Sequence, residues 1–185
     1  MKKIISVFIF LIVFSLIIVF YSFFIEPRFL KTEEIVLEIN NLPLGLENLV
    51  FVQISDLHFK KDSYKYQNLL KKIKEINPDF LFITGDLVDW QTKDLEALEN
   101  FCSLLSQNEK TKIYFVFGNH EHRNIYFKQI VKIIKNSKIK ILNNEGEKIF
   151  IGDYYFYLLG VDDIHSGKED LSKIRENLED NSFKI

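Results

Sequence analysis

Three short apolar runs, each followed directly by a polar cluster, constrain the fold of this chain more than any other feature. The runs cover residues 49–54, 80–83 and 113–117, and each is too short for a buried helix, so we expect buried strands. Residues 64–76 and 94–105, which lie between the runs, have apolar side chains spaced as on one helix face. Strands that alternate with helices predict an α/β fold of βαβ units with a largely parallel sheet.

The pattern changes in the second half of the chain. Residues 126–134 have helical spacing, and residues 139–142 form a fourth apolar run. Lys148–Ile151 and Tyr154–Leu159 flank Gly152-Asp153, which is typical of a tight hairpin turn between antiparallel strands. We expect a further helix over residues 171–178. The chain therefore adds an antiparallel pair to its parallel units.

An uncharged apolar segment precedes this α/β region. It extends from Ile4 to Ile25, and a membrane-spanning helix needs about 20 such residues. The segment is longer than the core of a secretory signal and has no small-residue cleavage pattern, which favours an uncleaved single-pass anchor. Two lysines precede it, and Arg28 and Lys31 follow it. With the amino terminus counted, this balance favours a cytoplasmic N-terminus and a domain on the extracytoplasmic side.

These segments divide the chain into three parts. Residues 1–25 form the predicted transmembrane anchor. Residues 26–48 form a linker and a first strand, because Glu34–Ile39 alternates loosely between polar and apolar residues and Asn40-Asn41-Leu42-Pro43 ends that pattern. Residues 49–185 form the α/β domain.

Charge and cysteine content narrow the function classes. The formal net charge is -2, so bulk electrostatics do not favour nucleic-acid binding. A lysine-rich stretch over residues 60–74 is either a solvated helix face or a surface that attracts an anionic substrate or lipid head group. Cys102 is the only cysteine, which excludes an intramolecular disulfide, and we expect it to be a small core residue.

The polar clusters at the ends of the three predicted strands carry the chemistry. In open α/β sheets, ligands bind outside the carboxyl ends of the strands, so the three clusters should meet in one crevice. Their carboxylate, imidazole and amide groups suit a divalent cation. Each cluster alone is a common pattern, and the evidence lies in having all three in order after apolar strands. The clusters are Asp56-Leu57-His58, Gly85-Asp86 and Gly118-Asn119-His120-Glu121.

The three clusters resemble the metal-binding motifs of the calcineurin-like metallophosphoesterases. That family has D-x-H, G-D-x-x-D and G-N-H-D/E, followed by a lone His and then G-H-x-H. This chain matches the first three blocks, including Asp89 in the second, and the resemblance covers roughly residues 49 to 185. It implies a β-sandwich flanked by helices.

The resemblance also implies a role for each matching residue. Asp56 and His58 would bind a first divalent cation, Asp86 would bridge two cations, and Asn119 would bind the second. The cations would be Mn, Fe or Zn ions and would activate a hydroxide for in-line attack on phosphorus.

Two further residues of the third motif have roles that do not involve direct metal binding. His120 would lie near the scissile phosphate and stabilise or protonate the leaving oxygen. Glu121 would orient His120.

The chain departs from the family pattern after the third block. Its histidines are at positions 58, 120, 122 and 165, and G-H-x-H is absent. We expect a domain that is incomplete at its C-terminus, with residues 181–185 beginning the strand before the next ligand. We interpret His122, Asp162, Asp163 and His165 as loop residues, while Arg123 is either a phosphate contact or a surface residue.

These observations predict a membrane-anchored, metal-dependent phosphoester hydrolase. Its substrate would contain a phosphodiester or pyrophosphate bond in a small molecule or a lipid-linked compound such as UDP-2,3-diacylglucosamine. We expect little hydrolysis from residues 1–185 alone, because the second metal site would keep only Asp86 and Asn119. The alternative is a non-catalytic membrane-anchored binding protein on a degenerate phosphoesterase fold. A nuclease is disfavoured by the acidic balance and the anchor, and no nucleic-acid partner is expected.

Overall fold

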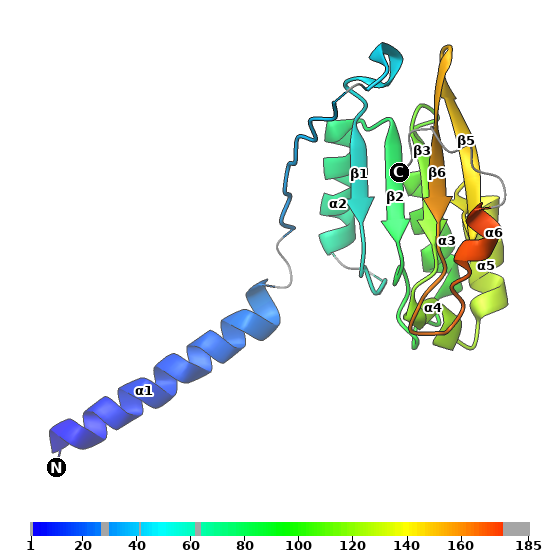
Figure 1. The fold of residues 1–185 in the computed structure, drawn as a ribbon. Helices are drawn as coiled ribbons and strands as arrows, with labels where there is room; N and C mark the ends of the chain where they lie inside the picture. Colours follow the sequence, from blue (N-terminus) through cyan, green and yellow to red (C-terminus); the bar gives the residue numbers. More distant parts are fainter. Residues whose placement is uncertain (1, 27–29, 41, 62–63, 176–185) are drawn as a thin grey trace.

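The N-terminal helix projects from the α/β domain in the computed structural model (Figure 1). The structure describes residues 2–26, 30–40, 42–61 and 64–175. Helix α1 (Lys2–Phe20) continues into a turn of π-helix, η1 (Tyr21–Ile25). An 18-residue stretch within Lys3–Ile25 has a mean hydropathy of 3.1, and none of that stretch is buried. Its length and composition are sufficient to cross a membrane.

A parallel sheet forms the centre of the domain, as the three apolar runs predict. Its strand order is β1-β2-β3-β4, and all three neighbouring pairs are parallel. Because β1, β2 and β3 are adjacent, their carboxyl ends lie at one edge of the sheet. The strands are β1 (Phe51–Ile54), β2 (Phe80–Thr84), β3 (Lys112–Val116) and the two-residue β4 (Lys140–Ile141).

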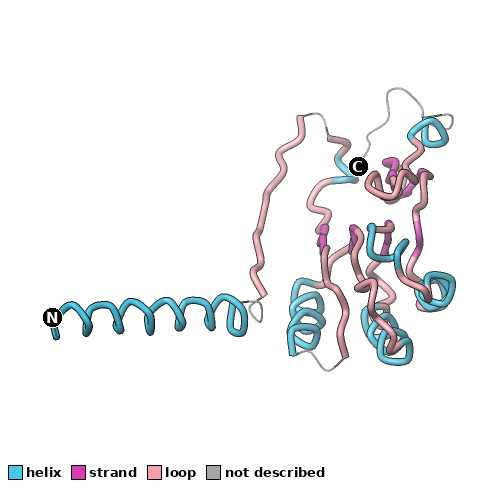
Figure 2. Tube along the Cα trace, turned by 90° about the horizontal axis from the view of Figure 1, so that it is seen from below, coloured by secondary structure: helices cyan, strands magenta, loops and turns pink. Residues whose placement is uncertain are grey.

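Helices cover one face of this sheet (Figure 2). Alternate residues of β2 point to opposite faces, so Leu81 and Ile83 belong to the core beneath the helices while Phe80 and Phe82 belong to the other face. Cys102 is fully buried in the helical core, as expected, and burial raises the pKa of its thiol to about 12. The covering helices are α2 (Tyr64–Ile76), α3 (Leu95–Leu105) and α5 (Phe127–Asn136).

An antiparallel hairpin covers the opposite face. Strands β5 (Glu145–Ile151) and β6 (Tyr154–Gly160) pair through Ile151 and Tyr154 at the predicted Gly152-Asp153 turn. Gly152 has φ +58°, a conformation that glycine adopts without strain. Ile149, Phe156 and Leu158 of the hairpin pack with aromatic residues of β2 and β3 in a second core. The short helix α6 (Leu171–Arg175) follows the hairpin.

Two sequence expectations require correction. Residues 34–39 do not form a strand, and the apolar side chains at Ile35, Val36 and Leu37 are 76%, 80% and 76% exposed. No strand among the described residues pairs with this segment, and an extended run gains little from β-propensity without a partner.

The second correction concerns the third polar cluster, which begins a short helix, α4 (Asn119–Arg123), that we did not expect. The expected strand at residues 181–185, and residues 176–178 of the expected last helix, lie outside the described residues.

Close packing at Gly160 holds the hairpin against the parallel sheet. A Cβ atom at this position would lie 2.2 Å from Leu142 Cβ and 2.8 Å from the Leu142 carbonyl oxygen. We predict that Gly160→Ala lowers the free energy of unfolding by about 1–3 kcal/mol, because the hairpin must move away from the sheet. Urea denaturation in detergent micelles, followed by far-ultraviolet circular dichroism, measures this change.

Gly146→Ala is the matched control, because Gly146 lies on the neighbouring strand and faces only a flexible side-chain end. Its added Cβ would meet Leu159 Cδ2 at 2.9 Å and the Leu158 carbonyl oxygen at 3.8 Å. The control should cost less than about 1 kcal/mol. Equal losses in the two variants would contradict the docking role of Gly160.

Candidate metal centre

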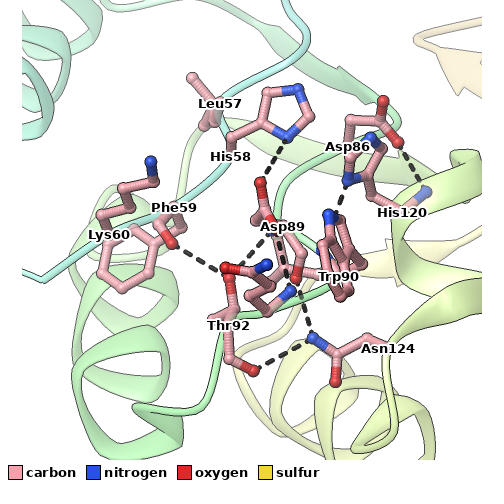
Figure 3. Close-up of polar contacts among 12 residues, drawn as sticks. Leu57, His58, Phe59, Lys60, Asp86, Asp89, Trp90, Thr92, His120 and Asn124 are labelled. Carbon is pink, nitrogen blue, oxygen red and sulfur yellow. Dashed lines mark hydrogen bonds and ion pairs between the residues drawn. The ribbon is translucent and has the colours of Figure 1, made fainter.

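The loops after β1, β2 and β3 bring three potential ligands together. One ligand atom from each of His58, Asp86 and His120 lies within 4.8 Å of the other two. The two imidazole rings are 4.5 Å apart between centroids and nearly perpendicular, at 76° (Figure 3). The adjacent parallel strands therefore deliver side chains from three separate motifs to one place, as the sequence predicts.

The backbone at these loops adopts an uncommon conformation. Asp56, His58 and Asp86 have φ values of +53°, +45° and +51°, which cost non-glycine residues on the order of 1 kcal/mol each. Hydrogen bonds between the first two loops hold this geometry, because His58 N donates to the Asp86 carbonyl at 2.9 Å and Phe59 N donates to the Leu87 carbonyl at 2.8 Å. Such strain is commonly concentrated at functional sites.

Two glycines allow the second and third loops to approach closely. A Cβ atom at Gly118 would lie 2.2 Å from Asp86 Oδ1, and one at Gly85 would lie 2.9 Å from Gly118 Cα. His120 N then donates to Asp86 Oδ1 at 3.0 Å. The Asp86 carboxylate thus lies directly over the start of α4, where a side chain at position 118 would displace it.

The fully buried carboxylate of Glu121 joins the second and third loops. Its Oε2 atom accepts from Gly118 N at 2.8 Å and from Asp86 N at 3.0 Å, and its Oε1 atom accepts from Val88 N at 3.0 Å. Burial raises the pKa of this carboxyl above its ordinary value, and the backbone N–H donors oppose that rise. Glu121 therefore shapes the loop that carries Asp86, whereas the resemblance implied that it orients His120.

The Asn119 amide lies beside the Asp86 carboxylate. Hydrogen-bonding chemistry places its nitrogen 3.2 Å from Asp86 Oδ2 and its oxygen 3.3 Å from Arg123 Nη1. Arg123 is exposed, and its guanidinium donates to the Asn119 oxygen in this orientation. Rotation of the Asn119 terminal torsion would turn its oxygen towards Asp86, where the two could share a cation.

Asp56 lies next to this cluster but outside it. The residue is exposed, its backbone N–H donates to the Gly85 carbonyl at 3.3 Å, and its Oδ2 accepts from the Ser55 hydroxyl at 2.6 Å. The group of three residues within 4.8 Å does not include it. Asp56 therefore lies on the loop where the sequence predicts it, but its carboxylate does not belong to the group of three close ligand atoms.

A turn formed by Asp89 and the next three residues faces both histidines of the cluster (Figure 3). Asp89 Oδ2 lies 3.8 Å from His58 Nδ1, a distance too long for a hydrogen bond. His58 Nδ1 is buried and makes no hydrogen bond. The Trp90 backbone N–H donates to His120 Nδ1 at 3.3 Å.

The donor set of this site suits a divalent metal ion. Carboxylate, imidazole and amide oxygen are ligands of Mn, Fe and Zn ions in proteins. The unpartnered buried nitrogen of His58 next to a carboxylate is typical of a metal-ligating histidine and the group that orients it. His58, Asp86 and His120 are the described residues whose ligand atoms lie close enough together to hold a cation, and the Asn119 amide lies beside Asp86.

Three supporting residues were not apparent from the sequence. The Tyr66 hydroxyl lies 3.1 Å from both the Leu57 and the His58 carbonyl oxygens, and burial raises its pKa. Thr92 and the buried Asn124 link the three loops through hydrogen bonds to backbone groups. Their sequence signal is weak, because tyrosine, threonine and asparagine are common on helices and turns and these contacts depend on tertiary structure.

His122 is not a loop residue, contrary to the expectation. It lies on α4, and its Nε2 is 2.7 Å from Oδ1 of the buried Asp162, which follows β6. Its ring packs between Phe117 and Phe127 at centroid distances of 5.3 Å and 5.2 Å. Asp162 is a structural loop residue, as expected, and this pair links α4 to the hairpin. His165 is exposed, also as expected.

We predict that Glu121→Gln destabilises the domain and loosens the Asp86 loop. A glutamine has one oxygen, so its NH2 group must face at least one of the three backbone N–H donors. The expected loss is about 1–3 kcal/mol in the free energy of unfolding, measured by urea denaturation. Hydrogen exchange at the Asp86 and Val88 amides should accelerate as well. Glu99→Gln on the exposed face of α3 is the control, and equal effects in both variants would contradict this role.

Comparisons with known proteins agree with this geometry. The calcineurin-like phosphoesterase family model matches residues 49–184. A transmembrane protein with a metallophosphoesterase domain from Danio rerio is 26% identical over 74% of this chain and 32% of its own length. A Campylobacter jejuni metallophosphoesterase is 29% identical over 74% of this chain and 36% of its own. The DNA double-strand break repair protein Mre11 from Methanocaldococcus jannaschii is 33% identical over 58% of this chain and 35% of its own.

Each of these matches spans about a third of the relative's own length. The family model covers the region of this chain that contains all three strand-end motifs. The strand order, the convergence of His58, Asp86 and His120, and the match over most of the α/β region lead to one conclusion. This chain belongs to the calcineurin-like phosphoesterase family.

Proposed function

We propose that this protein is a membrane-anchored, metal-dependent hydrolase of phosphodiester or pyrophosphate bonds. The observation that carries the proposal is the convergence of His58, Asp86 and His120 within 4.8 Å at the ends of adjacent parallel strands. The relatives named as metallophosphoesterases support the same reaction class.

The proposed roles follow the geometry of the site. His58 and Asp86, with Asp56 next to them, hold a first divalent cation. Asp86 and Asn119 hold a second. Bound divalent cations supply Lewis acidity that polarises phosphoryl oxygens and lowers the pKa of water.

His120 assists departure of the leaving group in this proposal. Its backbone N–H and its Nδ1 atom are engaged by Asp86 and by Trp90, which leaves Nε2 to face a substrate oxygen. Glu121 acts indirectly in this proposal. It accepts the backbone N–H groups of Asp86 and Val88 and so holds the loop that carries Asp86.

The substrate class rests on the N-terminal helix. An anchored domain encounters amphiphilic substrates at the bilayer surface, which favours a lipid-linked phosphate such as UDP-2,3-diacylglucosamine. We propose that α1 spans the membrane with the amino terminus in the cytoplasm and the domain outside. The apolar span Lys3–Ile25 and the Danio rerio relative named as a transmembrane protein support an anchor.

A nucleic-acid substrate is the second candidate. The Methanocaldococcus jannaschii relative is named as a DNA double-strand break repair protein and is similar to 58% of this chain. The net charge of -2 and the apolar helix favour the lipid-linked substrate over a polynucleotide.

We predict that Asp86→Asn lowers the affinity for Mn²⁺ at least about tenfold, because the amide removes the charge that both cations share. Isothermal titration of the full chain in nanodiscs measures this change. Asp79→Asn is the matched control, since Asp79 also accepts a backbone N–H, from Val50 at 3.0 Å, but lies at the opposite end of the sheet. Equal affinity in Asp86→Asn and the unsubstituted chain would exclude the site.

Turnover assays then separate the candidate functions. We expect little hydrolysis by the 185-residue chain, because among the described residues this proposal assigns only Asp86 and Asn119 to the second cation. Manganese-dependent cleavage of a UDP-linked lipid in vesicles, absent from Asp86→Asn, would support the proposal. Preferential cleavage of single-stranded DNA would support the nuclease. Tight Mn²⁺ binding without cleavage of any of these substrates would favour a non-catalytic binding protein.

A further inference from the structure

We propose that the end of the domain that carries the candidate metal centre rests on the surface of an anionic bilayer. Lysines around a hollow at this end contact lipid head groups, and exposed apolar side chains on three loops enter the membrane interface. The partner is the bilayer that α1 spans. The inference rests on the proposed function for this anchor, but the contact is measured without metal and without turnover.

A hollow of about 260 Å³ gathers lysines from the loops after β1 and β2. It is lined by residues 59–61, 89 and 91–94. The two loops are joined here, because the Thr92 hydroxyl donates to the Phe59 carbonyl at 3.1 Å. Lys60 and Lys61 follow Phe59 in the chain, and Lys93 follows Thr92. The joined loops therefore present three cations at one place.

The two carboxylates of the hollow leave two of these cations unpaired. Asp94 lies 3.1 Å from Lys61 Nζ and offsets its charge. Asp89 instead faces the candidate metal centre, which adjoins the hollow. Lys60 and Lys93 are exposed and form no ion pair within the described part of the chain. Their charges are therefore available to anionic groups outside the protein.

The structure divides the lysine-rich stretch of residues 60–74 into two parts. Its first two lysines belong to the hollow. On α2, Lys71 lies 3.9 Å from Glu75, one turn further along the helix, as on a solvated helix face. Lysines at the opposite end of the sheet are neutralised by carboxylates, in the pairs Lys110–Asp79 at 3.4 Å and Lys138–Glu109 at 3.2 Å. The hollow therefore attracts an anionic surface more strongly than these pairs do.

Three large apolar side chains are exposed on loops at the same end of the domain. Trp90 is 53% exposed, Ile125 is 78% exposed and Ile164 is 68% exposed. Their segments are joined, because the turn of residues 89–92 is bonded to the residue before Ile125, and Asp162 bonds the loop after β6 to α4. Tryptophan and aliphatic side chains next to lysines are typical of protein surfaces in the membrane interface.

The tether brings this end of the domain close to the bilayer. Leu30 is half-buried and packs against the helical core. It lies five residues after Ile25, where the apolar span ends, so the two residues are at most about 18 Å apart. Residues 30–40 then run along the side of the domain, from the end towards which the strands point to the end where η3 (Leu44–Leu46) lies (Figure 1). The anchor therefore joins the domain near the end that carries the candidate metal centre.

Trp90 is the only tryptophan of the chain, so its fluorescence reports the position of this end directly. The full chain is reconstituted without metal in vesicles of equal parts zwitterionic and anionic phospholipid with brominated acyl chains, which quench tryptophan on contact. We expect quenching of Trp90, and less of it at high salt or in zwitterionic lipid alone. Trp90→Phe combined with Phe150→Trp moves the reporter to the far end of the hairpin, where Phe150 is 60% exposed, and should show little quenching.

Charge variants test the lysines of the hollow. Lys60→Gln combined with Lys93→Gln should lower the ratio of docked to undocked domain about twentyfold, since one lysine at an anionic surface contributes about fivefold. The matched control combines Lys110→Gln with Lys138→Gln, which removes two exposed lysines at the opposite end of the sheet. It should leave the quenching of Trp90 unchanged. Far-ultraviolet circular dichroism checks that both double variants are folded.

Three results would overturn the inference. The first is equal quenching of tryptophan at positions 90 and 150, and the second is an equal effect of the two lysine pairs. The third is protection of Trp90 from aqueous acrylamide without quenching by brominated lipid, which would assign this face to a second copy or another protein. Quenching of Trp90 in a chain that binds no Mn²⁺ would support the inference and count against the proposed function. Mn²⁺ binding by a chain whose Trp90 stays unquenched would do the reverse, so the two can fail separately.

Discussion

The buried carboxylate of Glu121 is the interaction on which the rest of the site depends. It accepts backbone N–H groups from the loop after β2 and from the start of α4, so a single side chain fixes two of the three loops relative to each other. A buried carboxylate is costly unless it is fully hydrogen-bonded, and these three donors offset that cost. The same contacts bring Gly118 against Asp86, which places the Asp86 carboxylate over α4.

This arrangement explains why the strained backbone persists. Positive φ angles at His58 and Asp86 are unfavourable locally, but each residue belongs to a backbone hydrogen bond that the surrounding structure also requires. The His58 amide bonds to the Asp86 carbonyl, and Tyr66 from α2 contacts the His58 carbonyl. The helical core beneath the sheet therefore supports the loop conformation as well as the sheet itself.

The sequence predicted the features that arise from local pattern. Apolar runs and helical spacing predicted the parallel sheet and its helices, and the carboxyl-end rule predicted that residues as distant as His58 and His120 would meet. A strand at residues 34–39 was wrong, because a strand depends on a partner that local alternation cannot supply. The roles of Thr92 and Asn124 were also missed, since each acts through backbone groups of other loops. The ligand role of Asp56 stays a prediction, since its backbone bonds to the Gly85 carbonyl but its carboxylate is not in the group of three close ligand atoms.

The second sheet is coupled to the site by a contact that local pattern could not predict. Asp162 follows β6, and its pair with His122 ties the end of the hairpin to the helix that carries Asn119 and His120. Asp162 is itself held by Asn144, which accepts from its backbone N–H at 3.0 Å. Because both members of the pair are largely buried, movement of the hairpin would separate the Asp162 carboxylate from His122 and leave it only the Asp163 backbone N–H as a partner among the described residues. The packing of the hairpin on the sheet and the position of α4 are therefore coupled, through the second core and through the contact between His122 and Asp162.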